Sequence, residues 1–366
     1  MNNDLEKARE EIRRADAEII KNFEIRMKAA GAVAAYKKEY GLPIEDKEQE
    51  KKVTGRIASL TENEELRSYS ASLAECLMTL SKKYQSRLNE GFRVAYNGEK
   101  GAFAYIAAKK VFPEGNPVSY GSFEEAYRSV ENSESDIAIL PIENSYSGEV
   151  GKVIDLMYSG SLYVSGVYSL PVTQNLLGVP GTTIESISSV VSHPQALKQC
   201  DNFIQSHCWN TAAAESTAQA AKLISAKNDI HIASIGSAEC AEQFGLEIIR
   251  HDISESHENT TKFAVFTKKP VPASGDGGKF ILIFTVDDKA GALVKALNVI
   301  GRYGFNMQAL RSRPVREKAW QYYFYTEIEG DETSDEGKKM LEELASQCDT
   351  IKIAGHYSES GVIYDN

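Results

Sequence analysis

The stretch KNFEIRMKAAGAVAAYKK, residues 21–38, belongs to a long helical pattern that decides the fold of the N-terminal part of the chain. Alternate steps of four and three residues from Leu5 trace one helical seam. The seam consists of Leu5, Arg9, Ile12, Asp16, Ile19, Phe23, Arg26, Ala30, Val33 and Lys37. Burying a cation without an anion is costly, so we expect Arg9, Arg26 and Lys37 to meet an anionic partner.

The helical pattern continues to about Leu88, with breaks at residues 40–43 and near residues 61–63. This predicts a small helical domain. Its first helix would be about 50 Å long at 1.5 Å per residue, too long for two shorter helices to cover. We therefore expect a second copy of the chain to pack on it.

From residue 91 onward, strands and helices alternate up to about Lys269, which predicts an α/β domain. Apolar strands beside polar turns near residues 170–177 and 260–266 favour two lobes, between which the chain crosses and returns. A cleft is then expected between the lobes. VPASGDGG, residues 271–278, has the composition of a linker. The βαββαβ order that follows is typical of a ferredoxin-like unit.

The composition limits the function. A net charge of -11 over 366 residues argues against a nucleic-acid binder. The five cysteines are scattered without a CxxC pair, which disfavours disulfides and thiolate zinc sites. The charged N-terminus lacks a signal-peptide core, and the sequence shows no segment of membrane-span length, so we expect a cytoplasmic protein with no membrane partner. The histidines stand near no nucleophile and have no metal-ligand spacing.

The first ninety residues resemble the all-helical chorismate mutase domain. The resemblance assigns substrate binding to Arg9, Arg26, Asp46, Glu50 and Ser81, with Lys37 and Gln85 as catalytic donors. The rearrangement of chorismate to prephenate needs no nucleophile, only a clamp on two carboxylates and donors for the ether oxygen. In that family the first-helix arginine, here Arg9, reaches into the neighbouring subunit. Gln49 stands where the family usually has arginine, so we expect one charged contact fewer.

The middle region resembles prephenate dehydratase over about 180 residues. The resemblance rests on FRVAYNGEKGAFAYIAA, PIENSYSG, SHPQALKQC, ESTAQAA and NTTKFAVF in that order, the last with Thr-Lys-Phe in place of the usual Thr-Arg-Phe. Loss of CO2 drives out the ring hydroxyl, so the enzyme must help hydroxide leave. We expect Thr261 to donate a hydrogen bond to it. The other expected substrate-binding residues are Glu143, Asn144, Thr173, Gln195, Ser216 and Lys262.

His193 in Ser-His-Pro-Gln looks like an acid but stands at a helix start, and we expect it to be a capping residue. Glu143 alone after a strand is most often a turn residue, although it could support Asn144 by hydrogen bonding.

The C-terminal unit resembles the ACT regulatory domain of the same enzymes. The resemblance places an effector, L-phenylalanine, at Gly291, Ala292, Leu293 and Val294 and at Ser312, Arg313 and Pro314. The glycine lets backbone approach a ligand at the helix start. Arg311 stands where glutamate is usual, which reverses one charge. A domain kept for dimerisation alone is the alternative.

Together the resemblances predict a multidomain protein: an all-α chorismate mutase domain at 1–90, a two-lobed α/β, periplasmic-binding-protein-like dehydratase domain at 91–270, and an α+β ferredoxin-like ACT domain at 277–366. This order is similar to the bifunctional chorismate mutase/prephenate dehydratase of phenylalanine biosynthesis, a homodimer or higher homo-oligomer that needs no cofactor or metal. Two alternatives remain open: a dehydratase with a helical dimerisation module, and a non-catalytic sensor of prephenate or an amino acid.

Overall fold

The computed structural model describes residues 2–256, 258–270, 278–315 and 321–362 and divides into two compact units, Met1–Arg93 and Val94–Asn366. The first unit is helical, as predicted. It consists of α1 (Asn2–Glu39), α2 (Lys47–Ser59), the short 3-10 helix η1 (Glu64–Leu66) and α3 (Arg67–Glu90).

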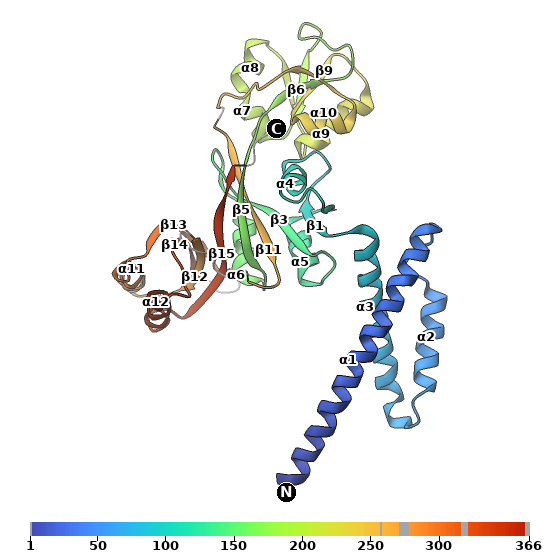
Figure 1. The fold of residues 1–366 in the computed structure, drawn as a ribbon. Coiled ribbons are helices and arrows are strands. Elements are labelled where there is room, and N and C mark those ends of the chain that lie inside the picture. Colours follow the sequence, from blue (N-terminus) through green and yellow to red (C-terminus); the bar gives the residue numbers. More distant parts are fainter. Residues whose placement is uncertain (1, 257, 271–277, 316–320, 363–366) are drawn as a thin grey trace. The chain divides into compact units, whose positions relative to one another are not determined.

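Only the second half of α1 has a packing partner in the helical unit. Ala34 of α1 and Ala74 of α3 are fully buried where these two helices meet. By contrast, every residue from 4 to 22 is exposed, and this segment extends past the α2–α3 hairpin (Figure 1). Its exposed apolar side chains include Leu5, Ile12 and Ile19 of the predicted seam. A helix that leaves this much apolar surface in water lacks part of its packing.

The second unit begins with an α/β lobe. Its elements are β1 (Arg93–Asn97), α4 (Phe103–Val111), β2 (Asn116–Tyr120), α5 (Phe123–Glu131), β3 (Ile137–Asn144), β4 (Gly148–Glu149), α6 (Gly151–Ser159), β5 (Tyr163–Pro171) and β11 (Thr260–Thr267). Most of β3 is buried, which explains its nearly continuous apolar sequence. β11 lies between β3 and β5 and is antiparallel to both.

The second lobe is inserted between β5 and β11. It contains β6 (Asn175–Gly178), β7 (Ser189–Ser192), α7 (Pro194–Gln199), α8 (Asp201–Ser206), β8 (Asn210–Ala213), α9 (Thr217–Lys227), β9 (Ile232–Gly236), α10 (Ala238–Phe244) and β10 (Glu247–Arg250). Its five strands have the order β10-β6-β9-β7-β8. The outgoing and returning chain segments meet where Val172 N donates to Asn259 O at 2.8 Å. The predicted crossing and return are therefore confirmed.

The C-terminal part has the predicted βαββαβ order. Its elements are β12 (Gly278–Thr285), α11 (Ala292–Arg302), β13 (Asn306–Pro314), β14 (Tyr322–Glu329), α12 (Asp335–Ala345) and β15 (Thr350–Val362). The hydrophobic core between its sheet and helices includes Phe280, Leu282, Ile300 and Met340. The predicted linker at 271–278 lies outside the described residues except for Gly278, which begins β12.

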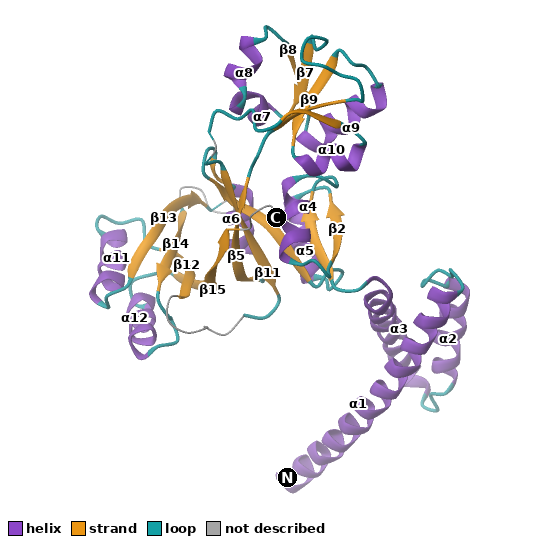
Figure 2. Cartoon of the chain, turned by 45° about the horizontal axis from the view of Figure 1, so that its top comes forward, coloured by secondary structure: helices purple, strands orange, loops and turns teal. Residues whose placement is uncertain are grey.

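One sheet is shared by the first lobe and the C-terminal part, a feature that the sequence did not predict. Its ten strands follow the order β13-β14-β12-β15-β5-β11-β3-β1-β2, with β4 paired to β3. β15 pairs in parallel with β5 and so joins the C-terminal part to the first lobe, as Figure 2 shows. One buried cluster accordingly combines Ile281 and Tyr325 with Ile154 and Met157 of α6.

None of the helices in the described parts of the chain is both long enough and apolar enough to cross a membrane.

Candidate active site

A cavity of about 390 Å³ lies between the two lobes of the second unit. Four of the residues predicted to bind or convert substrate line it: Asn144, Gln195, Ser216 and Thr261. They come from the end of β3, the first turn of α7, the start of α9 and the beginning of β11. The cavity therefore brings together side chains from both lobes that are far apart in the sequence, at the place where a cleft was predicted.

Asn144 is the centre of the polar network on the cavity wall. Its Nδ2 donates to Asn259 Oδ1 at 2.8 Å and to Thr261 Oγ1 at 2.9 Å. Its Oδ1 accepts from the backbone N–H groups of Tyr146 and Ser147 at 3.1 and 2.9 Å. Because both ends of the amide are engaged, its orientation is fixed by the turn after β3.

Gln195 extends this network from the second lobe. Its Nε2 donates to Ser147 Oγ at 3.1 Å and lies 3.5 Å from Asn144 Oδ1. Ser216 lies farther round the cavity, where its Oγ accepts from Gln219 N at 3.0 Å and caps α9. The serine hydroxyl hydrogen is left for another acceptor.

The cavity is lined by polar and apolar residues and by one carboxylate, Glu215. No lysine or arginine occurs among the described residues that line it. Instead it is lined by Ala102 and Phe103 at the start of α4 and by Ser216 and Thr217 at the start of α9. The N–H groups of a first helical turn have no partner within the helix and carry partial positive charge, so they attract carboxylates.

His193 is a neutral capping residue, as predicted. Its Nδ1 accepts from Gln195 N at 3.2 Å at the start of α7. A protonated Nδ1 could not accept this bond. Burial lowers the pKa of His193 below its ordinary value of 6.5. The ring therefore lines the cavity, caps α7 and carries no charge near neutral pH.

Three predicted substrate-binding residues do not line this cavity. Thr173 lines a smaller cavity of about 130 Å³. Its chain neighbours Val172 and Gln174 line the cavity between the lobes instead. Glu143 and Lys262 are register neighbours on β3 and β11, where their side chains form an ion pair of 3.4 Å. Successive strand residues point to opposite faces, so both lie on the far side of the strands from Asn144 and Thr261.

Sequence reasoning missed three amides. Asn259 is buried and fixes Asn144, although it stands in the quoted motif NTTKF. Gln174 and Gln199 both line the cavity and are joined by a hydrogen bond of 3.1 Å. Gln174 Oε1 is buried without a partner, so this amide pair can still interact with a bound molecule. The signal for Gln174 was its position one residue after Thr173, on the opposite face.

In the helical unit, four of the predicted residues lie on α1 and α3: Arg26, Lys37, Ser81 and Gln85. Arg26 Nη1 donates to Ser81 Oγ and, at 2.9 Å, to Leu77 O, and burial lowers the pKa of Arg26. Gln85, on the same helix as Ser81, is buried, and its Oε1 has no partner. Lys37 Nζ donates to Ile44 O at 2.6 Å. These cations bond to neutral oxygens that a carboxylate could replace.

The remaining mutase residues occupy different surroundings. Glu50 lies 3.1 Å from Lys82, a cation that the sequence reasoning missed, in a groove between α2 and α3. Asp46 Oδ1 accepts from Gln49 N at 3.0 Å and so caps α2. Arg9 is exposed and pairs with Glu6. Arg9 and Arg26 are seventeen helical steps apart along α1, about 26 Å at 1.5 Å per residue, so one chain does not bring them together.

The predicted effector residues lie on two elements of the C-terminal part. Gly291 adopts a φ of 82°, which favours glycine, and α11 begins at Ala292, followed by Leu293 and Val294. Ser312 and Pro314 are exposed on β13. Arg313 points the other way, with Nε 2.8 Å from Asp155 Oδ1 of α6 and Nη1 2.6 Å from Glu149. These bonds, Asp155 first, raise the pKa of Arg313 against the effect of burial.

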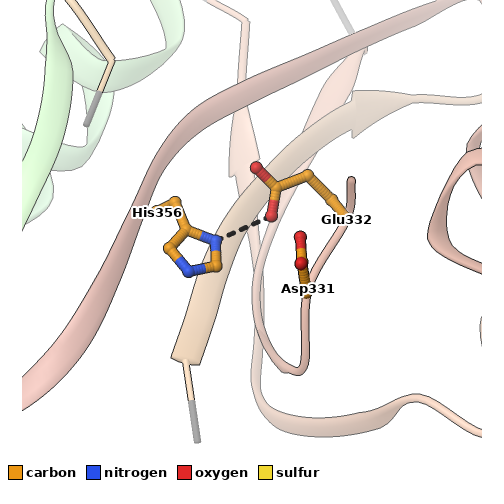
Figure 3. Close-up of side chains that lie close together, drawn as sticks. All are labelled: Asp331, Glu332 and His356. Carbon is orange, nitrogen blue, oxygen red and sulfur yellow. Dashed lines mark hydrogen bonds and ion pairs between the residues drawn. The ribbon is translucent and has the colours of Figure 1, made fainter. Parts of the chain in front are cut away.

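Within the described residues, one cluster has the donor atoms of a metal site: Asp331, Glu332 and His356 (Figure 3). Its donors are already engaged. His356 Nδ1 is 2.7 Å from Glu332 Oε2, and Asp331 Oδ1 accepts from Thr333 N and Oγ1. The unpartnered His356 Nε2 lies on the other side of the ring, toward Gly278. We read the cluster as a tie between β15 and the loop after β14.

Comparison with known proteins matches this architecture. The chain is similar to the bifunctional chorismate mutase/prephenate dehydratase of Buchnera aphidicola subsp. Acyrthosiphon pisum, with 31% identity over 372 residues that cover 97% of both chains. The chain belongs to the bifunctional chorismate mutase/prephenate dehydratase family. It is an enzyme with both activities, an isomerase and a lyase.

Each part of this chorismate mutase/prephenate dehydratase also matches a family model. Chorismate mutase type II matches residues 8–86, prephenate dehydratase residues 94–271 and the ACT domain residues 280–346. Among solved structures, it is similar to a prephenate dehydratase from Arthrobacter aurescens in complex with L-Phe. That chain shares the fold, with a TM-score of 0.69, 24% identity, and coverage of 73% of this chain and 90% of that one.

A second solved structure is similar in its arrangement of elements. It is described as GqqA, a novel type of quorum quenching acylase, and has a TM-score of 0.69 and 27% identity. It covers 73% of this chorismate mutase/prephenate dehydratase and 98% of its own chain. The likeness concerns the arrangement of elements, because function depends on the residues in the site.

Proposed function

We propose that prephenate is converted to phenylpyruvate in the cavity between the lobes, with Thr261 as the donor to the departing hydroxide. The single observation that carries this proposal is the bond from Asn144 Nδ2 to Thr261 Oγ1 at 2.9 Å. Because Oγ1 accepts from Asn144, its own hydrogen is left for an acceptor in the cavity. A preorganised donor of this kind stabilises charge that develops on the leaving oxygen.

The remaining polar groups of the cavity bind and orient the substrate in this proposal. The two carboxylates of prephenate are met by N–H groups at the starts of α4 and α9, with Gln195 and Ser216 beside them. As the ring carboxylate leaves as CO2, its bonding electrons enter the ring and the ring hydroxyl departs as hydroxide. Glu143, Lys262 and Thr173 lie outside the cavity wall, so we propose supporting roles for them.

The mutase reaction is proposed for the helical unit, completed by a second copy of the chain. Arg26 and Lys37 clamp the carboxylates of chorismate, Gln85 and Lys37 donate to the ether oxygen, and Glu50 and Ser81 hold the rest of the substrate. Asp46 supports the site by capping α2 beside Glu50. Arg9 enters from the other copy, in agreement with the exposed apolar seam of residues 4–22. The proposed assembly is a homodimer or a higher homo-oligomer.

We further propose that L-phenylalanine binds the C-terminal domain at Gly291–Val294 and at Ser312–Pro314 and controls the dehydratase. The proposed domain bounds are 1–90, 91–270 and 277–366. We place the protein in the cytoplasm, in keeping with its five free cysteines.

The test is to supply purified protein with chorismate alone and to follow chorismate, prephenate and phenylpyruvate by chromatography. We expect phenylpyruvate to appear through prephenate. The variant Thr261→Val should lower the dehydratase kcat by about 10²–10³-fold, the effect of removing one transition-state donor. Its matched control is Thr260→Val, on the opposite face of β11, with mutase turnover as an internal standard.

Each outcome has a definite meaning. A Thr261→Val protein that is folded and still converts prephenate at the wild-type rate would contradict the role of Thr261. Conversion of prephenate without consumption of chorismate would make the helices a dimerisation module. If neither substrate is consumed beyond its spontaneous decay, the non-catalytic sensor takes precedence.

A further inference from the structure

The pair of strands that carries Asn144 and Thr261 has a second face. In the antiparallel register of β3 and β11, Thr261 lies opposite Asn144 and Lys262 lies opposite Glu143. Side chains alternate between the faces of a strand, so Asn144 and Thr261 point into the cavity while Glu143 and Lys262 point to its back. Anything that holds Glu143 from behind acts one residue away from Asn144.

Arg311 of β13 reaches this back face from the ACT part. Its Nη2 donates to Glu143 Oε1, its Nε lies 3.4 Å from Glu149 Oε2, and its Nη1 lies 3.5 Å from Glu327 Oε1. The guanidinium also packs over the Tyr325 ring, 5.5 Å from its centroid. The side chain is only 20% exposed. One arginine thus joins carboxylates of β3, β4 and β14.

The charges on this face depend on that arginine. Burial lowers the pKa of Arg311, but Glu143, Tyr325 and Glu327 more than offset it, so the net direction is upward. Glu327 is 8% exposed at its side chain and otherwise accepts from the hydroxyls of Tyr325 and Tyr357. Without the guanidinium, the looser contact with Lys262 at 3.4 Å is the ion pair that Glu143 retains among the described residues. Partly buried carboxylates that lose their cation repel one another and shift.

We propose that Arg311 is a positioning residue for the dehydratase reaction, which acts from the ACT domain through Glu143 on the strand end that carries Asn144. This rests on the proposed role of the cavity around Thr261. The orientation of Asn144 is set by the backbone that follows it, so a shift of Glu143 is passed to the amide that bonds Thr261 Oγ1. A displacement of about 1 Å in such a group can cost about 10² in rate. In this proposal, the arginine that stands at position 311 in place of the usual glutamate holds Glu143.

The experiment compares two variants that each replace a cation of the ACT part by methionine. Arg311→Met removes the contact with Glu143. Lys352→Met is the matched control, because Lys352 Nζ donates to Met157 O at 2.6 Å, at the end of α6, and touches neither β3 nor β11. For prephenate, kcat and KM are measured separately, with mutase turnover of the same sample as the standard for active protein and near-UV circular dichroism as the check on tertiary structure.

We expect Arg311→Met to lower the dehydratase kcat about tenfold with KM changed less than about twofold, in the range of energies for coupled neighbouring groups. Lys352→Met should change kcat less than about twofold. Arg311→Lys, which keeps the charge but loses the planar fork, should recover part of the rate. The neutral variant Glu143→Gln, nearly unchanged in shape, should behave like Arg311→Met, and the double variant should lose no more than the worse single variant.

Three results would overturn the inference. The first is a folded Arg311→Met protein with wild-type kcat. The second is an equal loss in Arg311→Met and Lys352→Met, which would indicate loose docking of the ACT part in general. The third is additivity of Arg311→Met and Glu143→Gln. If Arg311→Met does not fold, Glu143→Gln alone decides by its kcat. Wild-type turnover of Thr261→Val would instead remove the cavity assignment itself, so the two failures are distinguishable.

Discussion

Ile19 offers the sharpest test of the second copy that the helical unit is proposed to bind. It lies on the apolar seam of α1, where it is 57% exposed among the described residues of the helical unit. The perturbation is Ile19→Asp, which puts a carboxylate at the centre of the seam. Because a homodimer with a twofold axis contains the residue twice, each substitution counts twice.

The magnitude follows from the exposed part of the side chain. Complete burial of an isoleucine stabilises by about 1.5–3 kcal/mol, so the exposed half is worth about 1–1.5 kcal/mol in each copy. An unpaired carboxylate in an apolar interface costs at least about 1–3 kcal/mol more. For two copies the loss is about 4 kcal/mol or more, which raises the dissociation constant by about 10³-fold or more.

The assay combines sedimentation equilibrium with both activities at nanomolar protein. We expect a lower weight-average mass and a mutase turnover reduced about 100-fold or more, because Arg9 no longer enters the other site. Ala17→Asp is the control, since it adds the same charge on the opposite side of the same exposed helix. Unchanged mass together with unchanged mutase turnover in Ile19→Asp would refute the pairing of α1.

Further predictions concern pH, packing and the mutase clamp. Since the pKa of His193 is lowered in the folded protein, its contribution to stability is complete above pH 6.5 and is lost as the pH falls below that value. His193→Asn, which keeps a capping acceptor, should flatten this part of the unfolding free energy curve, and equal slopes in both proteins would contradict the assignment. Gly355→Ala would put a Cβ 2.6 Å from Val164 N and even nearer to its carbonyl oxygen, so it should cost about 2 kcal/mol or more in denaturant melts. Gly301→Ala, which has open space, should cost nothing, and equal melting of the two would exclude close packing as the cause. Arg26→Met should lower mutase turnover about 10²-fold with dehydratase turnover retained, whereas an unaffected mutase would make the helices a scaffold.

The sequence predicted the elements better than their assembly. The helical unit and the βαββαβ part followed from local periodicity, which depends on residues a few positions apart. The pairing of β15 with β5 joins residues as distant as Gly355 and Val164, and parallel pairing leaves no turn between the strands to signal it. The partner of Arg311 was hidden for the same reason, because Glu143 belongs to another domain of the sequence.

Some of the expected site residues line one cavity between the lobes, and others lie outside it. Asn144, Gln195, Ser216 and Thr261 meet at the cavity because they stand at the ends of elements. Thr173 lines a neighbouring cavity, whereas Gln174, the next residue, lines the cavity between the lobes, because one position turns a side chain to the opposite face of an extended segment. Asp46 carries a helix-start signal, Asp followed three residues later by Gln49, that competes with substrate binding.

The shared ten-stranded sheet makes the ACT part hard to remove or exchange. A shortened protein that ends after β11 would leave β5 with a bare row of N–H and C=O groups, a template on which other chains polymerise. Such a truncation is expected to precipitate rather than to yield an unregulated dehydratase. A domain that replaced the ACT part would therefore have to supply a strand that pairs with β5.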